Sequence, residues 1–191
     1  MSKGRLEAFS DGVIAILITI MILELKVPHS TEFSALRPVV PQLLTYVMSY
    51  LYLGIYWNNH HHLLQMTTRV NGGILWANLH LLFWLSLFPF GTAWVGENHF
   101  APVPTAVYGV VLAMAGVAYY VLQGAIIKAE GPHSRLKAAV GRDAKGKASI
   151  ILYCLAIPLA FVSQWIAQAI YVVVALVWLI PDSRIESRID A

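Results

Sequence analysis

Long apolar segments are the feature that most limits what this chain can fold into. A helix needs about 20 mostly apolar residues to cross the roughly 30 Å hydrocarbon core of a bilayer. Segments of this kind occur at 6–27, 39–64, 74–95 and 103–127, and a longer apolar stretch covers 148–180. Only 12% of the residues are charged, about half the share usual in soluble domains. The sequence therefore predicts a membrane protein.

The last apolar stretch is too long for one span. Ser163, Gln164 and Gln168 interrupt its middle, and a tight turn near Ser163 divides it into helices at 148–162 and 165–180. The expected fold is all-α, with six transmembrane helices in a single domain over residues 1–191.

The basic residues predict the orientation. If the N-terminus is cytosolic, all of the 13 lysines and arginines except Lys26 and Arg37 lie on the cytosolic side, as the positive-inside rule requires. Both ends of a multi-pass protein of the cell membrane are then cytosolic. The basic loop at 128–147 is interpreted as a topology signal, and binding of anionic lipid headgroups is the alternative. The charge requires no nucleic-acid partner.

The first helix divides into two faces at about 100° per residue. Asp11 shares one face with Ala15, Ile18 and Ile22. We expect this face to contact other helices of the same subunit, because an unpaired carboxylate there costs several kcal/mol. Eight possible donors to Asp11 lie on the second and third predicted helices, 39–64 and 74–95: Asn58, Asn59, His60, His61, His62, Trp76, Asn78 and His80. A hydrogen-bonded clasp is favoured over proton transfer.

The opposite face of this helix mixes branched aliphatic residues with one hydroxyl. Its members are Arg5, Phe9, Gly12, Ile16, Thr19, Ile20 and Leu23. If copies of the helix surround a symmetry axis, Ile16, Ile20 and Leu23 form a narrow apolar neck with the Thr19 hydroxyls between them. Hydrophobic constrictions can gate ion flow by dewetting. Periodicity alone favours contact with lipid or a neighbouring helix over a pore.

The sequence gives little support for an enzymatic activity or for a metal or cofactor site. The three consecutive histidines at 60–62 point about 100° apart on a helix and cannot converge on one ion. The sequence contains no nucleophile motif, phosphate loop or cysteine ligand set. We therefore predict no enzyme, no metal site and no cofactor.

Motifs along the chain resemble those of a known family. Arg5, Phe9, Ser10 and Asp11 fit an R-x-x-x-F-S-D signature at the start of helix 1. Further matches are Tyr56-Trp57, Asn59-His60-His61, Leu75-Trp76-Ala77-Asn78, Pro89-Phe90 with Thr92, and Trp178 to Asp182. The chain is similar to the lysosomal-type potassium channels of the transmembrane protein 175 family, in its bacterial single-repeat branch.

This resemblance implies a homotetrameric, potassium-permeable cation channel with helix 1 around the pore. It assigns the hydrophobic constriction to Ile16, a polar ring to Thr19 and the next apolar ring to Leu23. It also implies a polar network that joins helix 1 to helices 2 and 3, with members Arg5, Phe9, Ser10, Asp11, His60, His61, Trp76 and Asn78. Which of the two histidines meets Asp11 stays open. Potassium is the permeant ion, and membrane lipids are the other expected partners.

One rival function uses some of the same residues. Asp11 and a helix 2 histidine could serve a proton-coupled secondary transporter. Inverted repeats would favour that function, and we find none in the sequence.

Overall fold

The computed structural model describes residues 2–131, 134–141 and 143–179. All regular structure in these ranges is helical, which confirms the predicted all-α fold. The elements are α1 (Lys3–Leu23), η1 (Phe33–Val39, a 3₁₀ helix), α2 (Val40–Gln65), α3 (Gly72–Ser86), α4 (Phe88–Glu97), α5 (Pro102–Glu130), α6 (Arg135–Val140), α7 (Ala144–Val162) and α8 (Gln164–Leu179).

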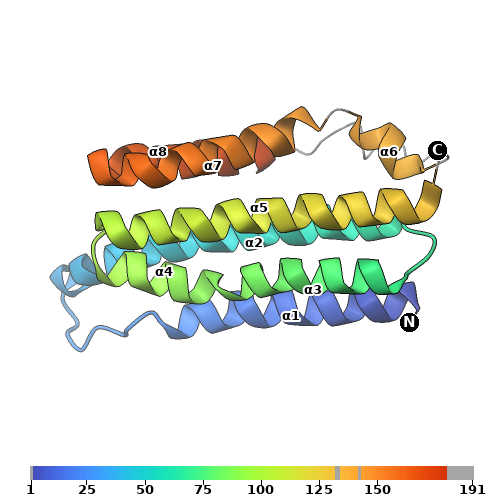
Figure 1. Cartoon of the computed structure of the whole chain (residues 1–191). Coiled ribbons are helices and arrows are strands. Elements are labelled where there is room, and N and C mark those ends of the chain that lie inside the picture. The colour runs from blue at the N-terminus through green and yellow to red at the C-terminus, as the bar shows by residue number, and fades with distance from the viewer. Residues whose placement is uncertain (1, 132–133, 142, 180–191) are drawn as a thin grey trace.

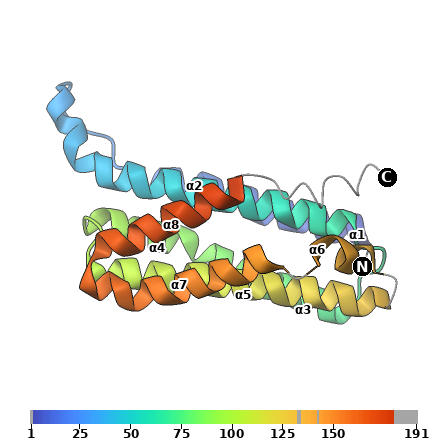
Figure 2. The same ribbon diagram turned by 90° about the horizontal axis from the view of Figure 1, so that it is seen from above.

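The long helices run side by side, with α5 at the centre (Figure 1). Helix α5 packs against α3 and α4 on one side and against α7 and α8 on the other. Helix α1 lies at the edge of the bundle, where it contacts α2, α3 and α4. Seen from above, α8 lies beside α2, and the two helices are in contact (Figure 2).

Within the described ranges, five stretches are long and apolar enough to cross a membrane: Lys3–Leu23, Phe33–Gln65, Gly72–Glu97, Pro102–Glu130 and Ala144–Val162. Helix α8 is apolar but shorter. The chain turns at Ser163, which is extended between α7 and α8, as its polar side chain predicted. Several residues singled out in the sequence lie outside the described residues: Arg142, Ile180, Pro181, Asp182, Arg184 and Arg188.

The segment expected as one helix at 74–95 is divided. Helix α3 ends at Ser86 and α4 begins at Phe88, with Leu87 capping both. Pro89 explains the division, because its nitrogen carries no hydrogen for the bond to the carbonyl four residues back. The two helices together still make one membrane-spanning stretch.

Buried tyrosines join the helices in the interior. The Tyr52 hydroxyl donates to the backbone oxygen of Tyr171 at 2.7 Å, and the Tyr153 hydroxyl donates to the Tyr52 oxygen at 3.2 Å. The Tyr171 hydroxyl in turn donates to the Thr105 carbonyl at 3.1 Å. A side chain at Gly109 would collide with the Tyr171 hydroxyl, so this packing requires glycine on α5.

Candidate functional site

One stripe of α1 attaches the helix to its own subunit. It consists of Leu6, Ser10, Ile14, Leu17 and Met21, all of them buried. These residues are spaced three or four apart, which places them on one side of a helix. Because they pack against α2, α3 and α4, the opposite side of α1 stays uncovered in the single subunit.

The face predicted to point inward was therefore wrong for two of its four members. Ala15 and Ile22 are exposed, Ile18 is half-buried, and Asp11 lies at the edge of the buried stripe. Burying a carboxylate is costly, so Asp11 needs a hydrogen-bond partner. That need does not bury Ala15 and Ile22, which share its face. Ser10 enters the interior instead of Asp11. Because the two residues are adjacent, the helix is rotated by roughly 100° from the expected orientation.

A buried chain of hydrogen bonds links α1, α2 and α3. The Asn78 amide donates to the Ser10 oxygen at 3.0 Å, and the Asn78 carbonyl oxygen lies 2.7 Å from His60 Nε2. All three side chains are fully buried. The Ser10 hydroxyl donates to the Leu6 carbonyl, so its oxygen is free to accept. This direction assigns the imidazole proton to His60 Nε2, and His60 Nδ1 has no partner among the described residues.

A second cluster lies beside this chain and is less buried. Asp11 accepts a hydrogen bond from Trp57 Nε1 at 3.0 Å. The Trp57 ring stacks against His61 with centroids 6.2 Å apart, and His61 Nδ1 lies 3.3 Å from the Glu7 carboxylate. Glu7 and Asp11 are four residues apart on α1, and Trp57 and His61 are four residues apart on α2. Residues at this spacing share a helix face, so one face of α1 meets one face of α2.

This second cluster corrects the donor expected for Asp11. Trp57, which sequence reasoning omitted as a donor, makes the contact. Its indole N–H is a donor only, and the Tyr56-Trp57 motif was the signal that could have identified it. His60 joins Asn78 and Ser10, whereas His61 joins Glu7.

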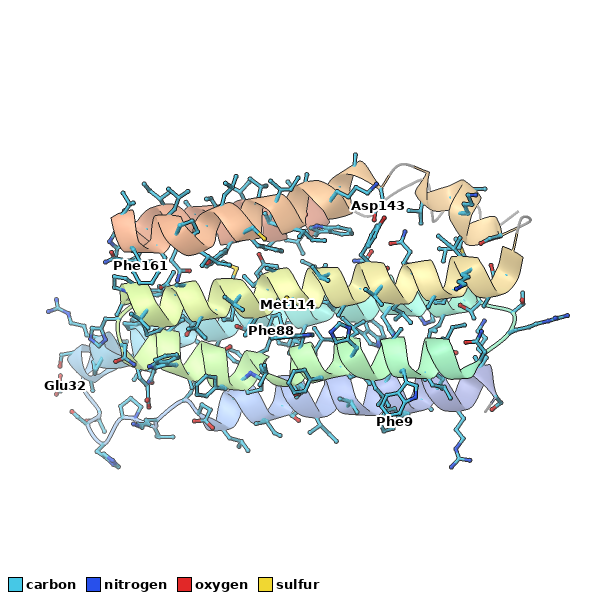
Figure 3. The ribbon with its side chains drawn as sticks, viewed as in Figure 1. Phe9, Glu32, Phe88, Met114, Asp143 and Phe161 are labelled. Atoms are coloured by element: carbon cyan, nitrogen blue, oxygen red, sulfur yellow. The ribbon has the colours of Figure 1, made fainter. Side chains whose placement is uncertain are left out.

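Other predicted members of the polar network do not meet it in the single subunit. Arg5 and Phe9 are exposed on α1, and Trp76 on α3 is 72% exposed. The Arg5 side chain forms no hydrogen bond or ion pair within the described part of the chain. Figure 3 labels Phe9 on α1, at the edge of the bundle.

The Ile16 stripe is uncovered in the single subunit. Ile16 is 57% exposed, Ile20 41% and Leu23 79%. Thr19 is also exposed, and its hydroxyl lies 2.9 Å from the Ile16 carbonyl and 3.1 Å from the Ala15 carbonyl. Because the hydroxyl proton bonds to the helix backbone, the lone pairs of the oxygen remain available outward. The stripe thus presents apolar side chains and one acceptor.

The long apolar helices define a multi-pass membrane protein. Buried hydrogen bonds hold α1 at the edge of the bundle, where one side of this helix is uncovered. The family described as the endosomal/lysosomal potassium channel TMEM175 matches residues 5–89. A potassium channel of Chryseobacterium sp. strain P1-3 is 56% identical over 189 residues, which cover 99% of this chain and 98% of that protein. The chain belongs to the TMEM175 family.

More distant members agree over nearly the whole length. A potassium channel of Streptomyces collinus is 32% identical over 185 residues, covering 91% of this chain and 90% of that protein. The crystal structure of a lysosomal potassium-selective channel TMEM175 homolog from Chamaesiphon minutus superposes with a TM-score of 0.80 at 28% identity, covering 94% of this chain and 97% of the other. Both proteins are described as channels, not as enzymes.

Proposed function

We propose that this protein is a potassium-permeable cation channel formed by four copies of the chain. Helix α1 of each copy surrounds the axis, and Ile16, Thr19, Ile20 and Leu23 line the constriction. The names of the bacterial relatives support potassium as the permeant ion, as does the similarity to the potassium-selective channel from Chamaesiphon minutus.

The observation that carries this proposal is the uncovered stripe on a helix that is otherwise well anchored. The Ile16 stripe lies roughly 130° around α1 from the buried stripe, at about 100° per residue. Its side chains therefore point away from the subunit that holds the helix. A symmetry axis on that side brings four such stripes together.

The constriction is short and mostly apolar. At a rise of 1.5 Å per residue, Ile16 and Leu23 lie only about 10 Å apart along the axis. Rings of isoleucine and leucine oppose wetting and so limit conduction. The Thr19 ring supplies the acceptor oxygens, which suit a hard monovalent cation because such ions prefer oxygen ligands. We expect moderate selectivity, since four hydroxyls form no dense carbonyl cage.

The polar network supports α1 from behind in this proposal. The fully buried Ser10, Asn78 and His60 fix the helix against α2 and α3, while Asp11 and Trp57 fix its rotation at the edge. Arg5, Phe9 and Trp76 are exposed in one subunit, and we propose that neighbouring subunits cover them. We also propose that the protein lies in the cell membrane with both ends in the cytosol.

Planar bilayers with potassium on one side and sodium on the other test this function. Wild-type protein should give unitary cation currents whose reversal potential favours potassium. Ile16→Asn should wet the neck and increase the leak, whereas Ile22→Asn, equally polar but on another side of α1, should leave conductance unchanged. Proton-dependent flux without unitary currents would instead support the transporter and overturn the proposal.

A further inference from the structure

A second feature lies away from the α1 stripe, between α2, α4 and α8. It is a cavity of about 290 Å³, far larger than the roughly 10–15 Å³ that is needed to hold one water molecule. Aliphatic and aromatic side chains form most of its wall, among them Met48, Leu51, Val95 and Trp165. Phe100, in contact with Trp165 at 5.4 Å between ring centroids, also lines it.

The polar side chains in the wall already have partners inside the protein. Thr45 donates to the Gln42 carbonyl at 2.9 Å, and Gln168 Nε2 donates to Thr105 Oγ1 at 3.3 Å. The Tyr108 hydroxyl lies 2.7 Å from Ser49 Oγ.

Thr92, the remaining hydroxyl in the wall, is satisfied in the same way. Its oxygen lies 2.6 Å from both Ser49 Oγ and the Phe88 carbonyl. Cavities with mostly apolar walls stay dry and take apolar occupants. Water is therefore a poor occupant for this space.

The surroundings of the cavity identify an apolar occupant. Its walls include residues of α2 and α8, and the wall residues Leu44, Val47, Trp165 and Val172 are exposed. In a membrane the medium against such side chains is lipid hydrocarbon. We infer that this cavity binds an acyl chain of a membrane lipid, inserted between α2 and α8.

The cavity is also close to α1. Thr92 lines it, and the same hydroxyl lies 3.7 Å from the sulfur of Met21, a member of the buried stripe of α1. Only the Thr92 side chain therefore separates the inserted acyl chain from Met21 in the buried stripe of α1. The binding site itself does not depend on the proposed pore, and its test uses a structural readout.

The experiment uses a phosphatidylglycerol probe with a diazirine midway along one acyl chain, reconstituted with the full-length protein. Met48 is the reporter because it lines the cavity and is only half-buried, so a chain inside the cavity can contact it. After photolysis, mass spectrometry should find label on Met48. Leu176, which is exposed on α8, should be labelled in every variant and shows that the probe has access to the protein in the bilayer.

Adjacent valines on α8 provide matched variants. Val172 lines the cavity, whereas Val173 is exposed and is not in its wall. Val172→Phe should abolish the label on Met48, the smaller Val172→Leu should reduce it, and Val173→Phe should retain it. If Val172→Phe fails to fold, Val172→Leu against Val173→Phe still decides the outcome.

Three results would overturn the inference. The first is an unlabelled Met48 beside a labelled Leu176 in the wild-type protein. The second is labelling of Met48 by a water-soluble diazirine, which would show a hydrated cavity. The third is efficient cross-linking of Val172→Cys to a second copy of the chain, which would show that a neighbouring subunit covers the cavity.

Discussion

Replacing Asn78 by leucine should destabilise the protein measurably, because Asn78 is the middle member of the buried chain between α1 and α2. The change removes two interhelical hydrogen bonds of 3.0 and 2.7 Å, each worth about 0.6 kcal/mol in membrane proteins. It also leaves the fully buried His60 ring with no partner among the described residues, which costs a further ~1–3 kcal/mol. The expected loss is therefore about 2–4 kcal/mol.

Thermal unfolding of the purified protein in detergent, followed by tryptophan fluorescence, measures this loss. For a chain of this size, 1 kcal/mol corresponds to about 2–4 °C in Tm, so Tm should fall by roughly 4–16 °C. The double variant His60→Leu with Asn78→Leu should lose less than the sum of the single variants, by about 0.5–3 kcal/mol, because the orphaned imidazole is gone. Strictly additive losses, or an unchanged Tm for Asn78→Leu, would refute the hydrogen-bonded chain.

Three further substitutions have expected outcomes. Gly109→Ala should lower stability by about 1–3 kcal/mol in the same unfolding assay, because the new methyl group collides with the buried Tyr171 hydroxyl; a normal Tm would contradict this packing. Thr19→Val keeps the shape but removes the only hydroxyl of the stripe, so reversal potentials in bilayers should show weaker preference for potassium over sodium, and an unchanged preference would exclude Thr19 from selectivity. Lys26→Ala breaks an exposed ion pair to Glu97 and should change stability by no more than about 1 kcal/mol in chemical denaturation; a larger loss would mean that the pair is buried in the assembly.

The positions of the spanning helices could be predicted because length and apolarity determine them almost alone. The turn at Ser163 follows from polar residues in the middle of a stretch too long for one span. The interruption at Leu87 was missed because the surrounding sequence stays apolar on both sides. Pro89 was the available signal, since proline within a helical pattern commonly marks a helix start or a kink.

The orientation of α1 could not be predicted in full. Ser10 and Asp11 are adjacent polar residues about 100° apart, and only their tertiary partners decide which of them enters the interior. Asn78 and His60 supply partners for a small hydroxyl deep in the bundle, whereas the carboxylate stays at the edge with Trp57. The register of α1 against α2 brings the Trp57 indole next to Asp11. This register cannot be predicted from the local sequence of either helix.

The direction of the Ile16 stripe is tested most directly by cysteine accessibility. Cys154 is exposed, so a Cys154→Ala background is used to place single cysteines at 20 and 22. Ile20 and Ile22 are about equally exposed in the single subunit, at 41% and 45%, but point about 160° apart. A thiol reagent or silver ion applied during recording should block the current of Ile20→Cys and leave that of Ile22→Cys unchanged. Equal block of both variants, or block of Ile22→Cys alone, would contradict a conduction path along this face of α1.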